Sequence, residues 1–428
     1  MKIAVIGMGK IGLPIAVQYA RKGNDVIGLD INSETIEKIN NGIEPFPGEK
    51  LLQTYLSEVL KNNKLSATLD FQKAIETAEV IVICIPLIIN SSNEPDFTNI
   101  DNVVEQIAKF MTKNTLISFE TTLPVGTTRN RFAKSISRIS KFQIGKDFFV
   151  VFSPERVFTG RIFEDLAKYP KLVGGVTESC TEKGVEFYEK VLDFDKRNDL
   201  KKENGVWSLK NSETAEFAKI AETTYRDVNI GLANEFSLYA LKKNVNFREV
   251  VEAANSQPFS HIHTPGISVG GHCIPVYPHF YIQDNPDSEI TKSARRRNLS
   301  MPQIAVNRIR ERLGSLKGLN IGVFGISYRA GVKEVAFSGA LDLLKSLNQE
   351  DAFVYGFDPF YSQEEIKDLG FLFTKGFENL DGIFIHTAHP EYSDYNYRGL
   401  SKLKFIFDGR HTIDQVSQIK PEVVLMNF

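Results

Sequence analysis

The most constraining feature of this chain is a glycine pattern at its amino terminus. A short apolar run, Ile3 to Ile6, leads directly into a Gly7-x-Gly9-x-x-Gly12 turn, and a helix-compatible stretch follows. Glycines at this spacing allow a tight turn, close approach of the backbone to a phosphate, and close packing of helix on strand. The pattern predicts a doubly wound α/β domain that binds a dinucleotide at the amino terminus of its first helix.

An acidic residue extends this prediction to the identity of the cofactor. Asp30 follows the next apolar run, Val26 to Leu29. A carboxylate at this place accepts hydrogen bonds from the adenosine ribose and repels a 2′-phosphate, which favours NAD over NADP. We therefore expect NAD as the cofactor, bound by Gly7, Gly9, Lys10, Ile11, Gly12 and Asp30.

The composition excludes several classes of protein. The chain has 428 residues, which suits two or three domains. Lys plus Arg total 51 and Asp plus Glu total 53, so the net charge of −2 offers no basic surface for nucleic acid. No apolar run reaches the roughly 18–20 residues of a membrane span, and the amino terminus resembles a strand rather than a signal peptide. We expect neither a nucleic-acid nor a membrane partner.

The cysteines indicate a reducing compartment. Three scattered cysteines do not form a disulfide framework, which favours the cytoplasm. Cys84 lies in an apolar run and is expected to be buried. Cys180 has polar neighbours in the sequence and is expected at the surface.

Short apolar runs alternate with helical patterns in both halves of the chain. Such runs are typical of parallel strands that are covered by helices on both faces. The predicted strands are residues 3–6, 26–29, 80–85, 116–119, 148–152, 319–324, 353–357, 383–386 and 405–407. Gly322 and Gly325 lack the spacing of the first turn, so a second dinucleotide is not expected.

The middle of the chain has a different pattern. Residues 211–243 contain no proline and predict one long helix, and a second helix is expected at 247–255. The predicted fold class is α/β, with two Rossmann-like domains joined by a helical segment. The expected boundaries are an NAD-binding domain at 1–205, a central segment at 206–312 and a second Rossmann-like domain at 313–428.

Cys273 is the candidate nucleophile. It follows Gly270, Gly271 and His272 in a loop rich in Pro, Gly and His, where backbone can approach a ligand and a thiol can stay accessible. A thiol beside a dinucleotide domain suggests covalent catalysis on an aldehyde, and hence a four-electron oxidation. The alternative is a cysteine that acts as a small buried hydrophobic residue.

Lys219 is a second candidate, on the predicted long helix. It shares one helix face with Thr223, Arg226, Asp227, Ile230 and Asn234, a mostly polar stripe that suits the wall of a site. Core contacts are expected from the other side, with Phe217, Ala221, Val228, Leu232 and Phe236. The alternative for Lys219 is an ordinary solvated charge.

Thr122 and Glu155 each follow a predicted strand. The carboxyl ends of parallel strands border the cofactor crevice, which places both residues near the reaction. The alternatives are that Glu155 pairs with Arg156 and that Thr122 caps a helix.

Taken together, these motifs resemble the UDP-glucose/GDP-mannose dehydrogenase family, the nucleotide-sugar 6-dehydrogenases. The similarity spans nearly the whole chain, and SPER and the long helix are closest to the branch that acts on UDP-N-acetylhexosamines such as N-acetylmannosamine or N-acetylglucosamine. It implies an NAD domain, a central helical segment that forms a homodimer, and a UDP-sugar domain. The matching segments are GMGKIG at 7–12, ETTLPVGTTR at 120–129, SPER at 153–156, AEFAKIAETTYRDVNIGLANE at 215–235 and PGISVGGHCIPV at 265–276.

The resemblance also implies a mechanism. The sugar C6 hydroxyl is oxidised to an aldehyde, Cys273 forms a thiohemiacetal, a second oxidation gives a thioester, and hydrolysis releases a uronate. Lys219 would stabilise the oxyanion, Glu155 would activate the hydrolytic water, and Thr122 would help to hold that water. Pro86 and Thr122 would contact the cofactor. The implied substrate contacts are Glu155, Arg156, Lys219, Thr223, His261, Gly270, Gly271, Arg329 and Arg410.

The chain departs from the family pattern at several positions. Thr223 replaces an asparagine, Tyr277 replaces an aspartate, and Ala336 replaces an arginine that contacts the nucleotide. Arg329 stands where the family has a lysine, and it keeps the positive charge with a forked set of donors. Arg410, in Asp-Gly-Arg, matches the family.

Other functions remain open at this point. Four histidines in or near the cysteine loop fit no zinc spacing, so no metal is expected. The alternatives are a UDP-glucose 6-dehydrogenase, a two-electron hydroxyacid or sugar-acid dehydrogenase, and a catalytically weak sugar-nucleotide-binding protein, the last suggested by Thr223 and Tyr277.

Overall fold

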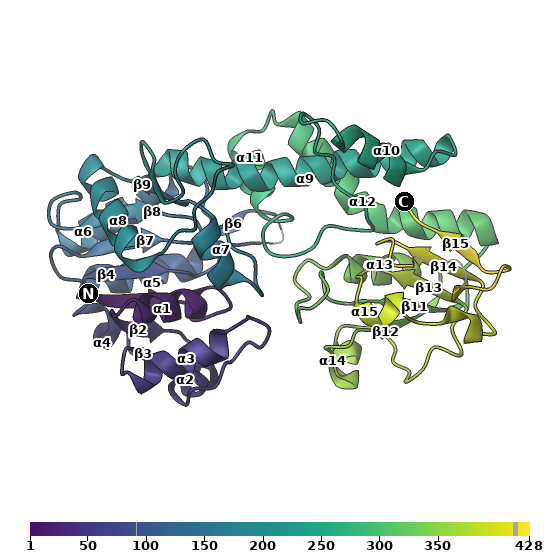
Figure 1. The fold of residues 1–428 in the computed structure, drawn as a ribbon, viewed down its shortest axis with the longest axis horizontal. Helices are drawn as coiled ribbons and strands as arrows, with labels where there is room; N and C mark the ends of the chain where they lie inside the picture. The colour runs from purple at the N-terminus through teal and green to yellow at the C-terminus, as the bar shows by residue number, and fades with distance from the viewer. Residues whose placement is uncertain (91, 414–417) are drawn as a thin grey trace. The chain divides into compact units, whose positions relative to one another are not determined.

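The chain folds into two compact units, residues 1–222 and 223–428 (Figure 1). The computed structural model describes residues 1–90, 92–413 and 418–428. Within this described part, each unit has its own parallel sheet with helices packed against it. The predicted α/β fold class is confirmed.

The sheet of the first unit has the strand order β10-β9-β8-β7-β4-β1-β2-β3. All neighbours are parallel except β8 and β9, which run antiparallel. The order reverses at β1, where β2 lies on one side and β4 on the other, and such a reversal opens a crevice at the carboxyl ends of the strands. The bounds are β1 (Lys2–Ile6), β2 (Asp25–Leu29), β3 (Leu65–Thr68), β4 (Val80–Ile83), β7 (Leu116–Phe119), β8 (Phe149–Phe152), β9 (Lys171–Gly175) and β10 (Val206–Ser208).

Helices cover both faces of this sheet. On one face α4, α5 and α6 pack against one another, and on the other α1 meets α8 through an edge-to-face contact of Tyr19 and Phe187 at 5.4 Å. The central strands β4, β7 and β8 are therefore buried along their whole length. The remaining elements are α1 (Gly12–Arg21), α2 (Ser33–Asn40), α3 (Leu52–Lys61), α4 (Phe71–Ile75), β5 (Ile88–Ile89), β6 (Pro95–Asp96), α5 (Thr98–Phe110), η1 (Thr128–Ala133), α6 (Lys134–Ser140), α7 (Ile162–Lys168) and α8 (Glu178–Val191).

The second unit has a parallel sheet of order β12-β11-β13-β14-β15. Its core lies on both faces, one cluster around Met301, Ile309 and Phe405 and another around Phe324 and Tyr392. The strands are β11 (Asn320–Phe324), β12 (Phe353–Phe357), β13 (Gly382–Ile385), β14 (Phe405–Asp408) and β15 (Val424–Met426). The helices are α10 (Phe247–Asn255), α11 (Tyr277–Asp284), α12 (Glu289–Leu313), α13 (Gly339–Asn348), α14 (Gln363–Asp368), α15 (Pro390–Ser393) and η2 (Tyr397–Gly399).

The two units repeat one turn at the end of their first strand. Gly7 and Gly325 both have positive φ, at 93° and 86°. The Gly7 N–H donates to the Leu29 carbonyl at 2.8 Å, and the Gly325 N–H donates to the Phe357 carbonyl at 2.7 Å. The second unit thus forms the same backbone turn without the full glycine pattern.

The long helix α9 (Ser212–Lys242) was predicted, but its faces were assigned the wrong way round. The polar residues Lys219, Thr223, Asp227 and Asn234 are at most 7% exposed. On the opposite side, which was expected to supply core contacts, Phe217, Leu232 and Phe236 are 47%, 44% and 42% exposed. The polar stripe faces inward because it is paired with buried polar groups of neighbouring elements, as described below.

Two further expectations need correction. Cys180 is fully buried in α8, where its sulfur accepts the Val150 N–H at 3.3 Å and the Thr177 hydroxyl at 3.1 Å. Its neighbours Glu178, Glu182 and Lys183 are exposed, whereas Thr181 is buried with it and accepts the Gly175 N–H at 2.9 Å. The strands β3 and β9 were missed because their residues are polar or glycine-rich, and β10 and β15 were missed because each has only three residues.

Candidate active site

The glycine turn has the shape that a dinucleotide needs. A Cβ built on Gly12 would lie 1.9 Å from the Gly7 carbonyl oxygen, so only glycine lets α1 approach β1 this closely. A Cβ on Gly9 would meet nothing within 4 Å, which leaves open space over the turn. Gly9 can therefore admit a pyrophosphate to the backbone at the amino end of α1. Lys10 and Ile11 are partly exposed beside it.

Asp30 lies at the end of β2, next to this turn. Its carboxylate accepts the Met8 N–H at 2.8 Å and the Asn32 N–H at 2.9 Å. These bonds orient the carboxylate and leave its side chain partly exposed, as a ribose contact requires. Pro86 is exposed just after β4, also at the carboxyl end of its strand. These residues fit a bound NAD.

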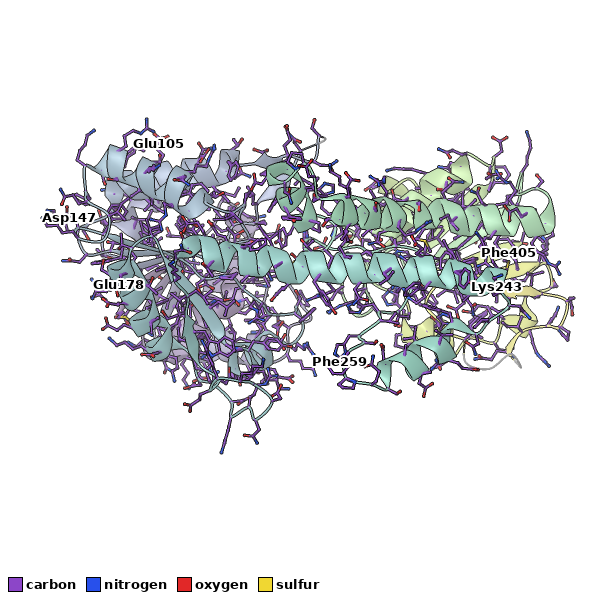
Figure 2. All side chains as sticks on the ribbon, turned by 90° about the horizontal axis from the view of Figure 1, so that it is seen from above. Glu105, Asp147, Glu178, Lys243, Phe259 and Phe405 are labelled. Carbon is purple, nitrogen blue, oxygen red and sulfur yellow. The ribbon has the colours of Figure 1, made fainter. Side chains whose placement is uncertain are left out.

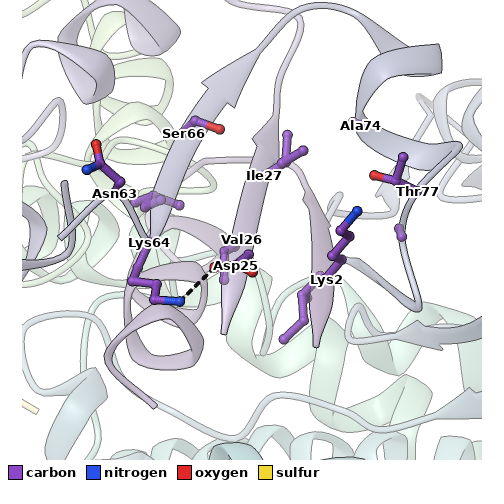
Figure 3. A pocket seen from close by; sticks show the side chains of 12 residues that line it. Lys2, Asp25, Val26, Ile27, Asn63, Lys64, Ser66, Ala74 and Thr77 are labelled. Carbon is purple, nitrogen blue, oxygen red and sulfur yellow. Dashed lines mark hydrogen bonds and ion pairs between the residues drawn. The ribbon is translucent and has the colours of Figure 1, made fainter. Parts of the chain in front are cut away.

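A hollow of about 340 Å³ lies at the opposite end of the same strands (Figure 3). Its lining includes Lys2, Asp25 and Lys64, from the amino ends of β1 and β2 and the loop before β3. Lys64 and Asp25 form an exposed ion pair at 2.8 Å. The hollow is separate from the glycine turn, because β1 and β2 span the distance between them.

Thr122 and Glu155 follow β7 and β8 as predicted. Thr122 is only 4% exposed. The Glu155 side chain is 9% exposed and forms an ion pair with Lys171 at the start of β9. The alternative pairing of Glu155 with Arg156 is wrong, because Arg156 instead donates to Glu222 at 2.9 Å.

Lys171 and Glu120 are buried ionisable residues that the sequence analysis missed. The Lys171 ammonium donates to Glu120 at 2.9 Å, and their side chains are 5% and 0% exposed. Burial lowers the pKa of Lys171, and the charge of Glu120 opposes that effect. The signal in the sequence was weak, because one lysine at the start of a strand resembles many surface lysines.

Lys219 is held inside the first unit. It is 7% exposed and lies 3.3 Å from the Glu222 carboxylate, one turn further along α9. Burial alone would raise the pKa of Glu222, but the charges of Lys219 and Arg156 lower it. Glu222 is therefore an ionised partner for both cations, and the prediction of a solvated lysine is excluded.

The cysteine loop belongs to the second unit. Cys273 is exposed, unlike the buried Cys180 and the partly buried Cys84. Gly271 has φ 94°, and its N–H donates to the Ala336 carbonyl at 3.0 Å. The loop is thus tied to the segment after β11 and presents the thiol to solvent.

The neighbours of Cys273 pack tightly. A Cβ built on Gly270 would lie 2.5 Å from the Tyr328 Cβ, and one on Gly271 would lie 3.0 Å from the Tyr328 ring. His272 lies 3.4 Å from the Glu334 carboxylate. Glycine is therefore required at both positions for the loop to close on Tyr328.

A buried polar network supports the start of this loop. The Asn234 side chain accepts the Gly266 N–H at 2.9 Å and donates to Asn298 of α12 at 2.9 Å. Asn298 donates to the Asp227 carboxylate at 2.7 Å, and Arg295 lies 3.0 Å from that carboxylate. Burial raises the pKa of Asp227 to about 6, although Arg295 and Asn298 oppose the shift. This network explains why the polar stripe of α9 is the buried one.

The remaining substrate candidates differ in exposure. Arg410 donates to the carbonyls of His386 at 2.8 Å and Ser268 at 3.5 Å, and so braces the same loop. Arg329 and His261 are exposed. Thr223 is 2% exposed on α9. Tyr277 is 8% exposed at the start of α11, so no acid occupies that position.

The described part of the chain holds neither a metal-ligand cluster nor a helix suited to a membrane. Residues 1–90, 92–413 and 418–428 contain no group of three or more His, Cys, Asp or Glu side chains placed to hold a metal ion. Within those ranges no helix is both long and apolar enough to cross a membrane.

A glycine turn with an acid beside it, and a second doubly wound unit with an exposed cysteine, are features expected of an NAD-dependent oxidoreductase. Known proteins agree with this class. The chain matches the UDP-glucose/GDP-mannose dehydrogenase family over its NAD-binding domain at residues 1–192, its central domain at 213–299 and its UDP-binding domain at 322–415.

Individual relatives cover nearly the whole chain. The UDP-N-acetyl-D-mannosamine dehydrogenase of Pyrococcus horikoshii is 35% identical over 97% of this chain and 96% of its own. The UDP-N-acetyl-D-mannosamine dehydrogenase of Methanocaldococcus jannaschii is 32% identical over 97% of this chain and 93% of its own.

Solved structures agree. The P. horikoshii UDP-D-ManNAc dehydrogenase has a TM-score of 0.89 at 33% identity and covers 100% of this chain and 99% of its own. The Staphylococcus aureus UDP-N-acetyl-mannosamine dehydrogenase has a TM-score of 0.84 at 31% identity. The match covers 100% of this chain and 98% of the S. aureus chain.

The chain belongs to the UDP-glucose/GDP-mannose dehydrogenase family. It is an NAD-dependent oxidoreductase that oxidises a UDP-sugar at C6. The family and the cofactor inferred from the motifs are confirmed.

Proposed function

We propose that this protein oxidises UDP-N-acetyl-D-mannosamine to the corresponding uronate, with two NAD consumed per sugar. The observation that carries the proposal is Cys273, an exposed thiol in a glycine loop that Tyr328 and Ala336 hold in place. The choice of sugar is supported by relatives at 31–35% identity, whose names specify that substrate.

Cys273 makes the four-electron outcome possible. The bound nicotinamide supplies the acceptor for each hydride. After the first oxidation the Cys273 sulfur adds to the C6 aldehyde and gives a thiohemiacetal. Loss of a second hydride from that carbon leaves a thioester, and water replaces sulfur to release the carboxylate and regenerate the thiol. Two hydrides leave the sugar and one water enters, so atoms and electrons balance.

Three residues of the first unit assist these steps in our proposal. Lys219, buried beside the Glu222 carboxylate, stabilises the negative oxygen that forms at C6. Glu155 accepts a proton from the hydrolytic water, and Thr122 holds that water. Glu155 is suited to this role because Lys171 keeps a positive charge against its carboxylate.

Substrate contacts follow from the same assignment. We assign the diphosphate and base to Arg329 and Arg410, since guanidinium groups bind phosphate oxygens through paired donors. The remaining contacts are assigned to Glu155, Arg156, Lys219, Thr223, His261, Gly270 and Gly271. The corresponding domains are 1–205 for NAD, 206–312 for the central segment and 313–428 for the UDP-sugar.

We also propose a homodimer that forms through the central helices. On one side of α9 the side chains of Phe217, Leu232, Phe236 and Tyr239 are 42–62% exposed in the single chain. Leu232, Phe236 and Tyr239 follow one another at spacings of four and three residues, and Phe217 lies 15 residues before Leu232, so all four lie on one side of the helix. Burying such a stripe against its copy removes apolar surface from water.

We propose that the protein is located in the cytoplasm, because the mechanism needs Cys273 as a free thiol. Reducing compartments keep such thiols from pairing.

The test is a panel of UDP- and GDP-sugars assayed for NADH, with mass spectrometry of the product. We expect two NADH and one uronate per UDP-N-acetyl-D-mannosamine. A preference for UDP-glucose would correct the sugar, and one NADH per sugar would make the enzyme a two-electron dehydrogenase. Tight binding of UDP-sugars without any NADH would support a binding protein, which Thr223 and Tyr277 make the natural alternative.

A further inference from the structure

A buried hydrogen-bond network surrounds Glu120, beyond the end of β7. One carboxylate oxygen accepts the Tyr19 hydroxyl at 2.9 Å and the Tyr188 hydroxyl at 2.6 Å. The other accepts the Lys171 ammonium at 2.9 Å. The pKa values of both tyrosines are raised well above their ordinary value, first by burial and then by the charge of Glu120. Both hydroxyls therefore keep their protons and act as donors to this carboxylate.

The strand topology brings Lys171 to Glu155. Strand β9 pairs antiparallel with β8, with Phe152 opposite Gly174. The same register continued three residues along places Glu155 opposite Lys171. An antiparallel neighbour in a parallel sheet thus sets its amino end beside the carboxyl end of β8, where the reaction is proposed. The Lys171 ammonium bonds Glu120 and Glu155 together.

The charges in this cluster depend on one another. Burial lowers the pKa of Lys171, whereas Glu120 raises it, and Lys219 from α9 lowers it further. The other titratable groups that face the cluster are Tyr19 of α1, Tyr188 of α8 and Cys84 after β4. Glu120 therefore helps to keep Lys171 protonated in a buried place.

We propose that Lys171, held by Glu120, is a positioning residue that keeps the Glu155 carboxylate oriented and ionised as the base for thioester hydrolysis. This inference rests on the function proposed above for Glu155. It adds a residue that touches no substrate and acts on the reaction through Glu155.

The proposal predicts opposite effects from the removal of Lys171 and of Glu120, the second carboxylate that Lys171 binds. Lys171→Met removes the cation and leaves Glu120 and Glu155 as neighbouring carboxylates, so the pKa of Glu155 rises by about 1 to 3 pH units. Glu120→Gln removes the carboxylate that competes for Lys171. The ammonium then pairs with Glu155 alone, and the pKa of Glu155 falls. A residue needed only for folding would not give shifts of opposite sign.

The first arm of the test measures the pH dependence of kcat for uronate formation. In Lys171→Met we expect the acidic limb of kcat to move to higher pH by about 1 to 3 pH units, so that kcat falls most on the acid side of pH 7, with KM nearly unchanged. Lys171→Arg, which keeps the charge, should recover most of kcat, and Glu120→Gln should move the limb to lower pH. The matched control is Lys22→Met, which removes an exposed ion pair with Asp193 at 2.7 Å in the same unit.

The second arm does not depend on turnover. Carbon-13 NMR of glutamate-labelled protein, with the Glu155 signal assigned by its loss in Glu155→Gln, follows the titration of that carboxyl directly. A Glu155 pKa that stays the same in both Lys171→Met and Glu120→Gln overturns the proposal. If Lys171→Met does not fold, the other two variants test the proposal. The pKa of Glu155 should then fall in Glu120→Gln and stay near its wild-type value in Lys171→Arg, and an unchanged pKa in Glu120→Gln overturns the proposal. A wild-type protein that makes no NADH with any nucleotide sugar would instead refute the proposed function and leave this titration valid.

Discussion

The Glu216 carboxylate accepts the backbone N–H of Thr128 at 2.8 Å, and this bond ties the first turns of α9 to the loop after β7. Its other oxygen accepts the Gly126 N–H at 2.5 Å. The same loop contains Thr122, and the same helix contains Lys219. One buried carboxylate therefore joins the loop and the helix that contain two proposed catalytic residues.

This carboxylate should make stability depend on pH. Burial raises the pKa of Glu216 from 4.5 to about 7, although bonds to Thr128 and Gly126 oppose the shift. The folded state then favours the protonated form, so the stabilisation is complete below pH 4.5 and is lost as the pH rises to about 7. The loss should approach about 3 kcal/mol relative to Glu216→Gln, which does not titrate.

Urea unfolding of wild type and Glu216→Gln from pH 4.5 to 8 measures this difference. The stability of the wild type relative to the variant should decrease steadily with pH. A difference that is constant over this range would show that Glu216 has an ordinary pKa.

Cys273→Ser should abolish uronate formation. Serine cannot form the thioester, so kcat for the acid should fall by more than about three orders of magnitude, while NAD binding stays near normal. Mass spectrometry of the product and NAD titration measure both quantities. Because Cys273 is the exposed cysteine, iodoacetamide should modify it first and inactivate the native enzyme. Normal uronate production by the variant would remove the thiol from the mechanism.

Asp30→Ala should weaken NAD binding and relax its selectivity over NADP. The lost hydrogen bonds to the ribose should cost about 1.5–3 kcal/mol, or roughly 10- to 150-fold in affinity. Calorimetric titration with both cofactors measures the change. Asp25→Ala is the matched control, because Asp25 lies at the opposite end of β2. An equal loss in both variants would mean that Asp30 acts only through stability.

Charged residues on the exposed side of α9 should separate the proposed dimer. Leu232 and Phe236 are 44% and 42% exposed, and the double change Leu232→Lys with Phe236→Lys should give monomers in sedimentation velocity. Glu182→Lys changes the charge at an exposed position of α8, outside the proposed interface, and should remain dimeric. A wild-type protein that sediments as a monomer would refute the dimer. A double variant that still sediments as a dimer would refute the interface on α9.

Phe259 is a further exposed aromatic residue, in a different segment from the α9 stripe. It is 93% exposed in the loop after α10 and is labelled in Figure 2. Nothing in the described part of the single chain explains so exposed an aromatic side chain.

Local patterns allowed much of this protein to be predicted. The turn at Gly7, the Asp30 carboxylate, α9 and the exposed Cys273 all depend on residues close together in the chain. Backbone sterics and periodicity act over a few residues, so their outcome can be inferred from spacing.

Pairings between distant segments were not predictable in the same way. Glu155 pairs with Lys171, not with its neighbour Arg156, because β9 runs antiparallel to β8. The faces of α9 were reversed because Asn298 and Arg295 of α12 satisfy its polar stripe inside the second unit. Polarity alone favoured the opposite orientation.

The sequence by itself thus determined the two doubly wound units, the NAD turn and the position of the thiol. Only the tertiary structure decided which buried charges are partners. A buried charge is stable only beside a group that compensates its lost hydration, and that group can come from any strand or helix that the fold brings near.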